Sequence, residues 1–138
     1  MTFQDLPRGW GDGPLDHDLL PDVVDLLVSE RERFGGCLML LIVRGDGRLH
    51  REPILISELP LHTGPDGSEA VFHHILETIA PDGGTLVVAR GRRGPAEVTA
   101  DDAGWSAFLR RHLGDALVGF FLATPGSVIE VRDGAAAA

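Results

Sequence analysis

Residues 85–102 read TLVVARGRRGPAEVTADD, and they contain the clearest indication of fold class in the chain. The first five, Thr85–Ala89, are apolar or β-branched, which is typical of a short strand in the centre of a sheet. A polar loop, Arg90–Glu97, follows. Thr99 then stands where a helix N-cap is expected, with Asp102 at the third helical position, where a carboxylate is favourable. A strand that leads through a loop into a helix is the repeating unit of α/β proteins.

Three elements are predicted upstream of this segment. Apolar residues at helical spacing predict a helix over Leu19–Arg33, with Pro21 in the first turn, where a missing backbone donor is tolerated. The continuous apolar run Cys37–Val43 is typical of a strand buried on both faces. After a glycine-rich turn, a second strand is expected within Arg48–Ser57. Pro53 favours an edge or a bulge there, because proline has no N–H to donate.

The remaining elements continue the alternation. Ser68 is the expected N-cap of a helix that runs to about Ala80. The helix that begins at Thr99 is followed by two strands, Leu117–Ala123 and Val128–Val131, joined by a turn. The expected order is therefore α-β-β-α-β-α-β-β, which predicts an α/β fold with a mixed sheet flanked by helices.

The chain is expected to form one α/β domain over residues 18–133. Its 138 residues, 43% of them hydrophobic, suffice for a single core. Residues 1–17 are rich in Gly, Pro and Asp and predict a flexible N-terminal arm. Residues 134–138, GAAAA, carry little to bury and predict a disordered tail.

The composition argues against several classes of function. A net charge of −9 repels phosphate backbones, so we expect no general nucleic-acid binding. The chain contains no lysine, which excludes a Schiff-base lysine and a P-loop lysine. The first residues lack the pattern of a secretory signal, and no apolar run is long enough to cross a membrane. We therefore expect a cytoplasmic protein that does not contact a membrane.

Strong catalytic and metal-binding motifs are missing from the sequence. It has no Gly-x-Ser-x-Gly elbow, no Walker loop, no His-Glu-x-x-His and no three-glycine dinucleotide fingerprint. His73 and His74 are adjacent on a predicted helix and point about 100° apart, so they cannot share one ion well. The single cysteine, Cys37, opens an apolar strand and is expected to be a small buried side chain. We expect no catalytic residue, no metal ligand and no cofactor.

The loop after the central strand is the most informative candidate site. It contains three arginines, Arg90, Arg92 and Arg93, between a strand end and a helix N-terminus. Loops in this position are favoured ligand sites in α/β folds, and guanidinium groups bind phosphates and carboxylates bidentately. The alternative interpretation is an exposed basic loop that balances an acidic surface.

The strand before these arginines and the helix start Thr99-Ala100-Asp101-Asp102 belong to a longer pattern that extends over Cys37–Arg132. This pattern resembles the RadC branch of the JAB/MPN metalloprotease-like family. The family has a strand hairpin, a helix, a strand that runs into His-x-His-Pro-x-Gly, a Pro-Ser-x-x-Asp helix start and two closing strands. The resemblance implies a JAB/MPN-like, cytidine-deaminase-like α-β-α sandwich. In the family, the two histidines and the aspartate bind zinc, and an upstream glutamate acts on the metal-bound water.

At the diagnostic positions this chain departs from the family. The resemblance places Arg90 and Arg92 where the family has its two histidines, and Asp102 where it has the aspartate. Glu52 or Glu58 stands near the position of the glutamate. Arginine is a fixed cation without a lone pair, so two arginines would repel Zn²⁺. The resemblance therefore implies a metal-free, inactive relative.

The first functional hypothesis is accordingly a non-catalytic binding or scaffold domain that acts through protein–protein contacts, as a homo-oligomer or with a partner protein. The first helix and the edge of the hairpin are the expected contact surfaces. The second hypothesis is an anion- or nucleotide-binding module, or an enzyme, that uses the arginine loop at 90–93. The third is a metallohydrolase with unusual ligands.

Overall fold

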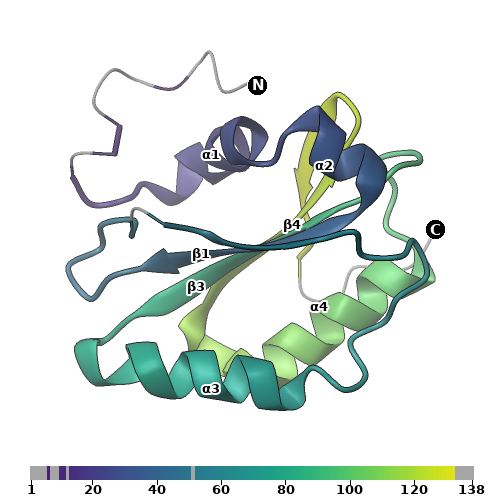
Figure 1. Cartoon of the computed structure of the whole chain (residues 1–138). Helices are drawn as coiled ribbons and strands as arrows, with labels where there is room; N and C mark the ends of the chain where they lie inside the picture. Colours follow the sequence, from purple (N-terminus) through teal and green to yellow (C-terminus); the bar gives the residue numbers. More distant parts are fainter. Residues whose placement is uncertain (1–5, 7–9, 12, 51, 133–138) are drawn as a thin grey trace.

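The computed structural model describes residue 6 and residues 10–11, 13–50 and 52–132, and Figure 1 shows the arrangement of the elements. The helices of this part of the chain are α1 (Leu20–Leu27), α2 (Glu30–Gly35), α3 (Glu69–Ile79) and α4 (Ala100–Leu113). Its strands are β1 (Cys37–Val43), β2 (Ile54–Ser57), β3 (Thr85–Gly91), β4 (Leu117–Thr124) and β5 (Ser127–Glu130). Short 3₁₀ turns lie at His17–Leu19, Ala80–Asp82 and Gly114–Ala116.

The five strands form one mixed sheet in the order β2-β1-β3-β4-β5. β1 runs antiparallel to both of its neighbours, β2 and β3, whereas β3 and β4 are parallel and β5 returns antiparallel to β4. The sheet therefore has β3 at its centre, as its apolar sequence predicts. The predicted α/β fold with a mixed sheet flanked by helices is confirmed.

Helices cover both faces of the sheet, with α1 and α2 on one side and α3 and α4 on the other (Figure 1). Each face has its own apolar core, because successive side chains of β1 and β3 point to opposite faces. Leu38, Leu40 and Val88 pack in the core under α3 and α4, and Met39 and Val87 pack in the core under α1. The continuous apolar sequences of β1 and β3 thus reflect burial on both faces, as expected.

The central strand is longer than the sequence predicts. We expected it to end at Ala89 and the loop to begin at Arg90, but β3 continues to Gly91. The reason is pairing with β1, which places Leu38 opposite Arg90 and Cys37 opposite Gly91. Arg90 therefore lies within the sheet and not in a loop.

The prediction of one continuous helix over Leu19–Arg33 is wrong. α1 ends at Leu27, Val28 is extended, and Ser29 caps α2 by accepting a hydrogen bond from the N–H of Glu32. The side chain of Arg33 turns back and donates to the carbonyl of Val28 at 2.9 Å. Apolar spacing continued across the break and concealed it, whereas the serine cap was the local signal for it.

β2 is an edge strand, which agrees with the position expected from Pro53. Ser68 lies at the N-cap of α3, but its side chain makes no capping hydrogen bond. The helix at Thr99 begins where predicted, with a complete capping box between Thr99 and Asp102. The two closing strands are also present, and β5 begins one residue earlier than predicted.

Parts of the predicted N-terminal arm pack against the core. Leu6, Trp10 and Leu15 contact the apolar core under α1, and the N–H of Leu15 donates to the carbonyl of Gly47 at 2.7 Å. The predicted tail at 134–138 lies outside the described residues. Within the described ranges, no helix combines the length and the apolar character needed to span a membrane.

Candidate functional site

Three charged side chains meet where β3 ends and α4 begins. Arg90 is the penultimate residue of β3, Arg92 follows the strand, and Asp102 lies in the first turn of α4. Nη1 of Arg90 is 2.5 Å from Oδ1 of Asp102, and Nη2 of Arg92 is 2.7 Å from Oδ2. All three side chains are buried, with exposed fractions of 1%, 3% and 0%. We call Arg90, Arg92 and Asp102 the arginine–aspartate cluster.

Backbone carbonyls around the cluster accept further hydrogen bonds from both arginines, although the buried Nε of Arg90 has no partner among the described residues. Arg92 donates to the carbonyls of Arg93, Pro95 and Glu97, so its side chain organises the turn that leads into α4. Arg90 donates to the carbonyl of Leu61 in the segment between β2 and α3. The cluster therefore ties three separate segments together at this end of the sheet.

Asp102 has a second function at the start of α4. Its carboxylate accepts from the N–H of Thr99 at 2.9 Å, and the Thr99 hydroxyl accepts from the N–H of Asp102. Burial alone would raise the pKa of Asp102. Hydrogen bonds from Arg92 and Thr99 and the charge of both arginines outweigh burial and hold this pKa below its usual value. The carboxylate is therefore ionised at neutral pH.

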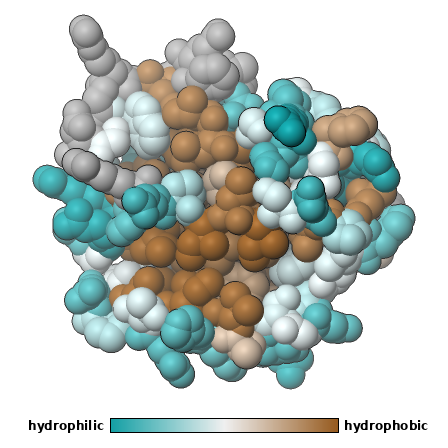
Figure 2. Space-filling model, in the orientation of Figure 1, coloured by the Kyte–Doolittle hydropathy of each residue, from teal (hydrophilic) through white to brown (hydrophobic). Residues whose placement is uncertain are grey.

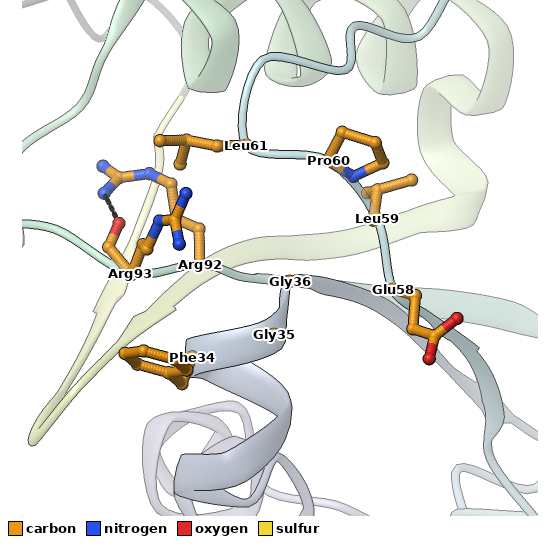
Figure 3. Close-up of a pocket in the computed structure, with 9 residues that line it drawn as sticks. All are labelled: Phe34, Gly35, Gly36, Glu58, Leu59, Pro60, Leu61, Arg92 and Arg93. Carbon is orange, nitrogen blue, oxygen red and sulfur yellow. Dashed lines mark hydrogen bonds between the residues drawn. The ribbon is translucent and has the colours of Figure 1, made fainter.

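A pocket opens beside the cluster and is shown in Figure 3. It lies between the end of α2, the segment after β2, and Arg92 and Arg93. At Gly36, on its floor, an added Cβ would lie 2.1 Å from the carbonyl oxygen of Leu59, so only glycine permits this close approach of the two segments. The pocket is lined by Phe34, Gly35, Gly36, Glu58, Leu59, Pro60, Leu61, Arg92 and Arg93.

The structure separates the three arginines that the sequence grouped as an anion site. Arg90 and Arg92 are turned inward to Asp102, and Arg93 alone of the three is exposed. An internal carboxylate thus occupies the donors that were expected to face a ligand. An anion site in this loop stays a prediction, and it would depend on Arg93.

The two candidate glutamates lie in different places. Glu58 lines the pocket beside the cluster, on the side opposite the arginines, and its carboxylate points away from them (Figure 3). Its φ of 58° is unusual for a residue other than glycine. Glu52 is exposed near the hairpin turn, and its N–H donates to Nδ1 of His50. The structure therefore places Glu58, and not Glu52, in the pocket that Arg92 and Arg93 also line.

Arg33, a third buried arginine, could not be singled out from the sequence. It lies on the α1 side of the same sheet end and donates to the carbonyl of Thr124 in β4. It also donates to the backbone carbonyl and to the side-chain carboxylate of Asp25. A basic residue in the last turn of a helix is common, and nothing in the sequence distinguishes this one from an exposed arginine.

Cys37 is fully buried and behaves as a small core residue, as predicted. Burial raises the pKa of its thiol to about 11, so the thiol is protonated at neutral pH. Its Sγ lies against Gly91, where an added Cβ would be 2.6 Å away.

Across the described ranges, no three or more His, Cys, Asp and Glu side chains are grouped so that they could hold a metal ion. Comparison with protein-family models, with curated proteins and with solved structures finds no match to this chain.

Proposed function

We propose that this chain is a non-catalytic protein-binding domain with a JAB/MPN-like core, in which the arginine–aspartate cluster stands in place of a metal centre. The element order and the sheet order β2-β1-β3-β4-β5 support a cytidine-deaminase-like arrangement. The antiparallel placement of β1 beside β3 is compatible with the same arrangement.

The observation that carries the proposal is the contact of both arginines with Asp102. The resemblance aligns these three residues with the two histidines and the aspartate that bind zinc in the family. Here the same positions converge in space, yet the two cations neutralise the carboxylate and leave it no free charge for a metal ion. The residues present therefore do not fit zinc, and no hydrolytic step can be assigned to them.

The edge strand β2 is the proposed binding surface. One side of β2 pairs with β1, and among the described residues no strand pairs with its other side. Leu55 and Ile56 are 43% and 39% exposed, which is unusual for adjacent apolar residues on an edge strand. In the orientation of Figure 1, apolar surface fills the middle of this face, between α1 and α3 (Figure 2).

The occupant that fits this edge best is an extended segment of a different protein. Two copies paired antiparallel about Leu55 would bring Glu52 of one copy toward Glu58 of the other, and like charges opposite each other are destabilising. Pairing about Ile56 would instead place the apolar Ile54 of one copy opposite the charged Glu58 of the other, which is also unfavourable. A partner strand with apolar residues in its centre and basic residues at its ends avoids both costs.

The binding test uses two synthetic peptides that share a core of alternating Val and Ile. One peptide has arginine at both ends and the other has glutamate. We expect the arginine peptide to protect the β2 amides from hydrogen exchange and the glutamate peptide to leave them unprotected. Ile56→Lys should abolish binding, whereas Val71→Lys on α3, which also replaces an exposed apolar residue, should not.

Two results would overturn this proposal. One is the absence of any β2 protection by the arginine peptide. The other is a concentration-dependent dimer, seen by sedimentation equilibrium, that Ile56→Lys dissociates, because the occupant would then be a second copy.

The JAB/MPN-like core is tested separately by restoring the family's ligands. The double substitution Arg90→His and Arg92→His gives two histidines beside Asp102, and we expect this variant to bind zinc more tightly than the matched Arg90→Gln, Arg92→Gln variant. Both variants lose the same charges, so the difference reports on ligation alone. Equal zinc binding by the two variants, both shown to be folded by circular dichroism, would contradict the proposed JAB/MPN-like core.

A further inference from the structure

We propose that His73 of α3 and His112 of α4 form a two-histidine binding site for a divalent transition-metal ion, such as Zn²⁺, Ni²⁺ or Cu²⁺. The pair joins the two helices on the side of the sheet opposite α1. It is separate from the arginine–aspartate cluster and does not depend on the function proposed above.

The distance between the two rings carries the inference. Nε2 of His73 lies 3.4 Å from Nδ1 of His112, and the ring centroids are 5.4 Å apart. Two imidazole nitrogens bound at about 2.0–2.1 Å to one tetrahedral ion are about 3.3 Å apart. The nitrogens thus already have the separation that chelation requires, and small rotations of the rings would direct both lone pairs to one point.

The surrounding aromatic side chains hold this geometry. The ring of His112 packs against Phe108, one helical turn earlier in α4, with centroids 4.4 Å apart. Phe108 in turn makes an edge contact with Phe72, the residue before His73, at 5.6 Å. Because Phe72 and Phe108 belong to the core, the backbone positions of both histidines are fixed by buried packing.

The chemistry of the pair indicates the class of ion. Neutral imidazole suits Zn²⁺, Ni²⁺ and Cu²⁺, whereas Mg²⁺ and Ca²⁺ prefer oxygen ligands. Within the described residues no third His, Cys, Asp or Glu completes the set, so water would fill the remaining positions. A chain with a net charge of −9 also attracts cations.

A bound ion would act as a clamp between α3 and α4. The two ligands come from different helices, so the ion binds the folded state and not the unfolded chain. The melting temperature should therefore rise as the concentration of the ion increases. The site differs from the adjacent pair His73-His74, whose rings leave one helix in different directions.

Calorimetric titration of the full chain with ZnCl₂ and NiCl₂ tests the proposal. We expect His73→Ala and His112→Ala each to weaken binding at least tenfold, because each leaves only one of the two imidazole ligands. His74→Ala is the matched control, since it removes an exposed histidine from the same helix, and it should bind as the unaltered chain does. MgCl₂ should give no binding.

Melting temperatures provide the second readout. Zinc should stabilise the unaltered chain and the His74→Ala variant but not the His73→Ala variant. The proposal fails if the unaltered chain does not bind zinc, or if all three single variants bind it equally. Equal binding would place the ion at other side chains, and loss of binding on Asp102→Asn alone would place it at the cluster.

Discussion

At the scale of single residues, Asp102 is the side chain on which most of this sheet end depends. It is the shared anionic partner of two buried arginines and completes the capping box of α4. We expect Asp102→Asn to lower the free energy of unfolding by about 3–5 kcal/mol, because it leaves buried charges without a partner. Urea denaturation measures this loss. The neighbouring Asp101→Asn, which removes a half-exposed partner of His62, should change it by less than about 0.5 kcal/mol.

The same carboxylate predicts how stability varies with pH. The pKa of Asp102 is lowered in the folded state, so the unfolded state binds its proton more tightly and acid favours unfolding. This contribution is complete above the unfolded pKa of about 4 and is lost as pH falls toward the folded value. The urea midpoint of the unaltered chain should therefore fall more steeply below about pH 4 than that of Asp102→Asn. Parallel profiles would contradict the assignment.

Gly91 and Cys37 form a second single-residue test. A methyl group at Gly91 would meet Sγ of Cys37, so Gly91→Ala should lower the free energy of unfolding by about 1–3 kcal/mol. Adding Cys37→Ala to the same chain should recover part of this loss, since it removes the closest atom. Gly104→Ala in α4 meets no atom within 4 Å and should be neutral or stabilising by up to about 1 kcal/mol. A loss with Gly104→Ala equal to that with Gly91→Ala would refute the steric explanation.

At the scale of elements, the two N-caps of the α3–α4 layer differ in a way that stability measurements can detect. Thr99 accepts a hydrogen bond from the backbone of α4, whereas Ser68 makes none with its side chain at the start of α3. Thr99→Ala should therefore cost about 1 kcal/mol. Ser68→Ala should cost much less, although both residues occupy N-cap positions. Similar losses from the two substitutions, measured by thermal unfolding, would show that the caps are equivalent.

At the scale of the whole molecule, the two apolar cores share the strands that separate them. β1, β3 and β4 contribute side chains to both faces, so neither core can be exposed without breaking the same sheet. We expect one cooperative unfolding transition. Trp105 lies in the core under α3 and α4, and its fluorescence in a Trp10→Phe variant should lose native character at the same urea concentration as far-UV circular dichroism. Separate midpoints would show that the two faces unfold independently.

The fold class followed from local pattern alone. The apolar runs at Cys37–Val43 and Thr85–Ala89, the proline before β2 and the capping box at Thr99 each have one dominant structural interpretation, because burial, a missing N–H and a helix cap act within a few residues. The order of the elements, the central position of β3 and the edge position of β2 could therefore be predicted.

The arrangement of charges could not be predicted from the sequence. Whether Arg90 and Arg92 face solvent or Asp102 depends on contacts between residues 10 to 12 positions apart and on the pairing of β1 with β3. The pairing of His73 with His112 depends on how α3 and α4 pack. The break at Ser29 depends on the hydrogen bond from the Arg33 side chain to the carbonyl of Val28. Periodicity fixes which side of an element is buried, but only packing fixes which polar groups meet there, because their partners come from distant parts of the chain.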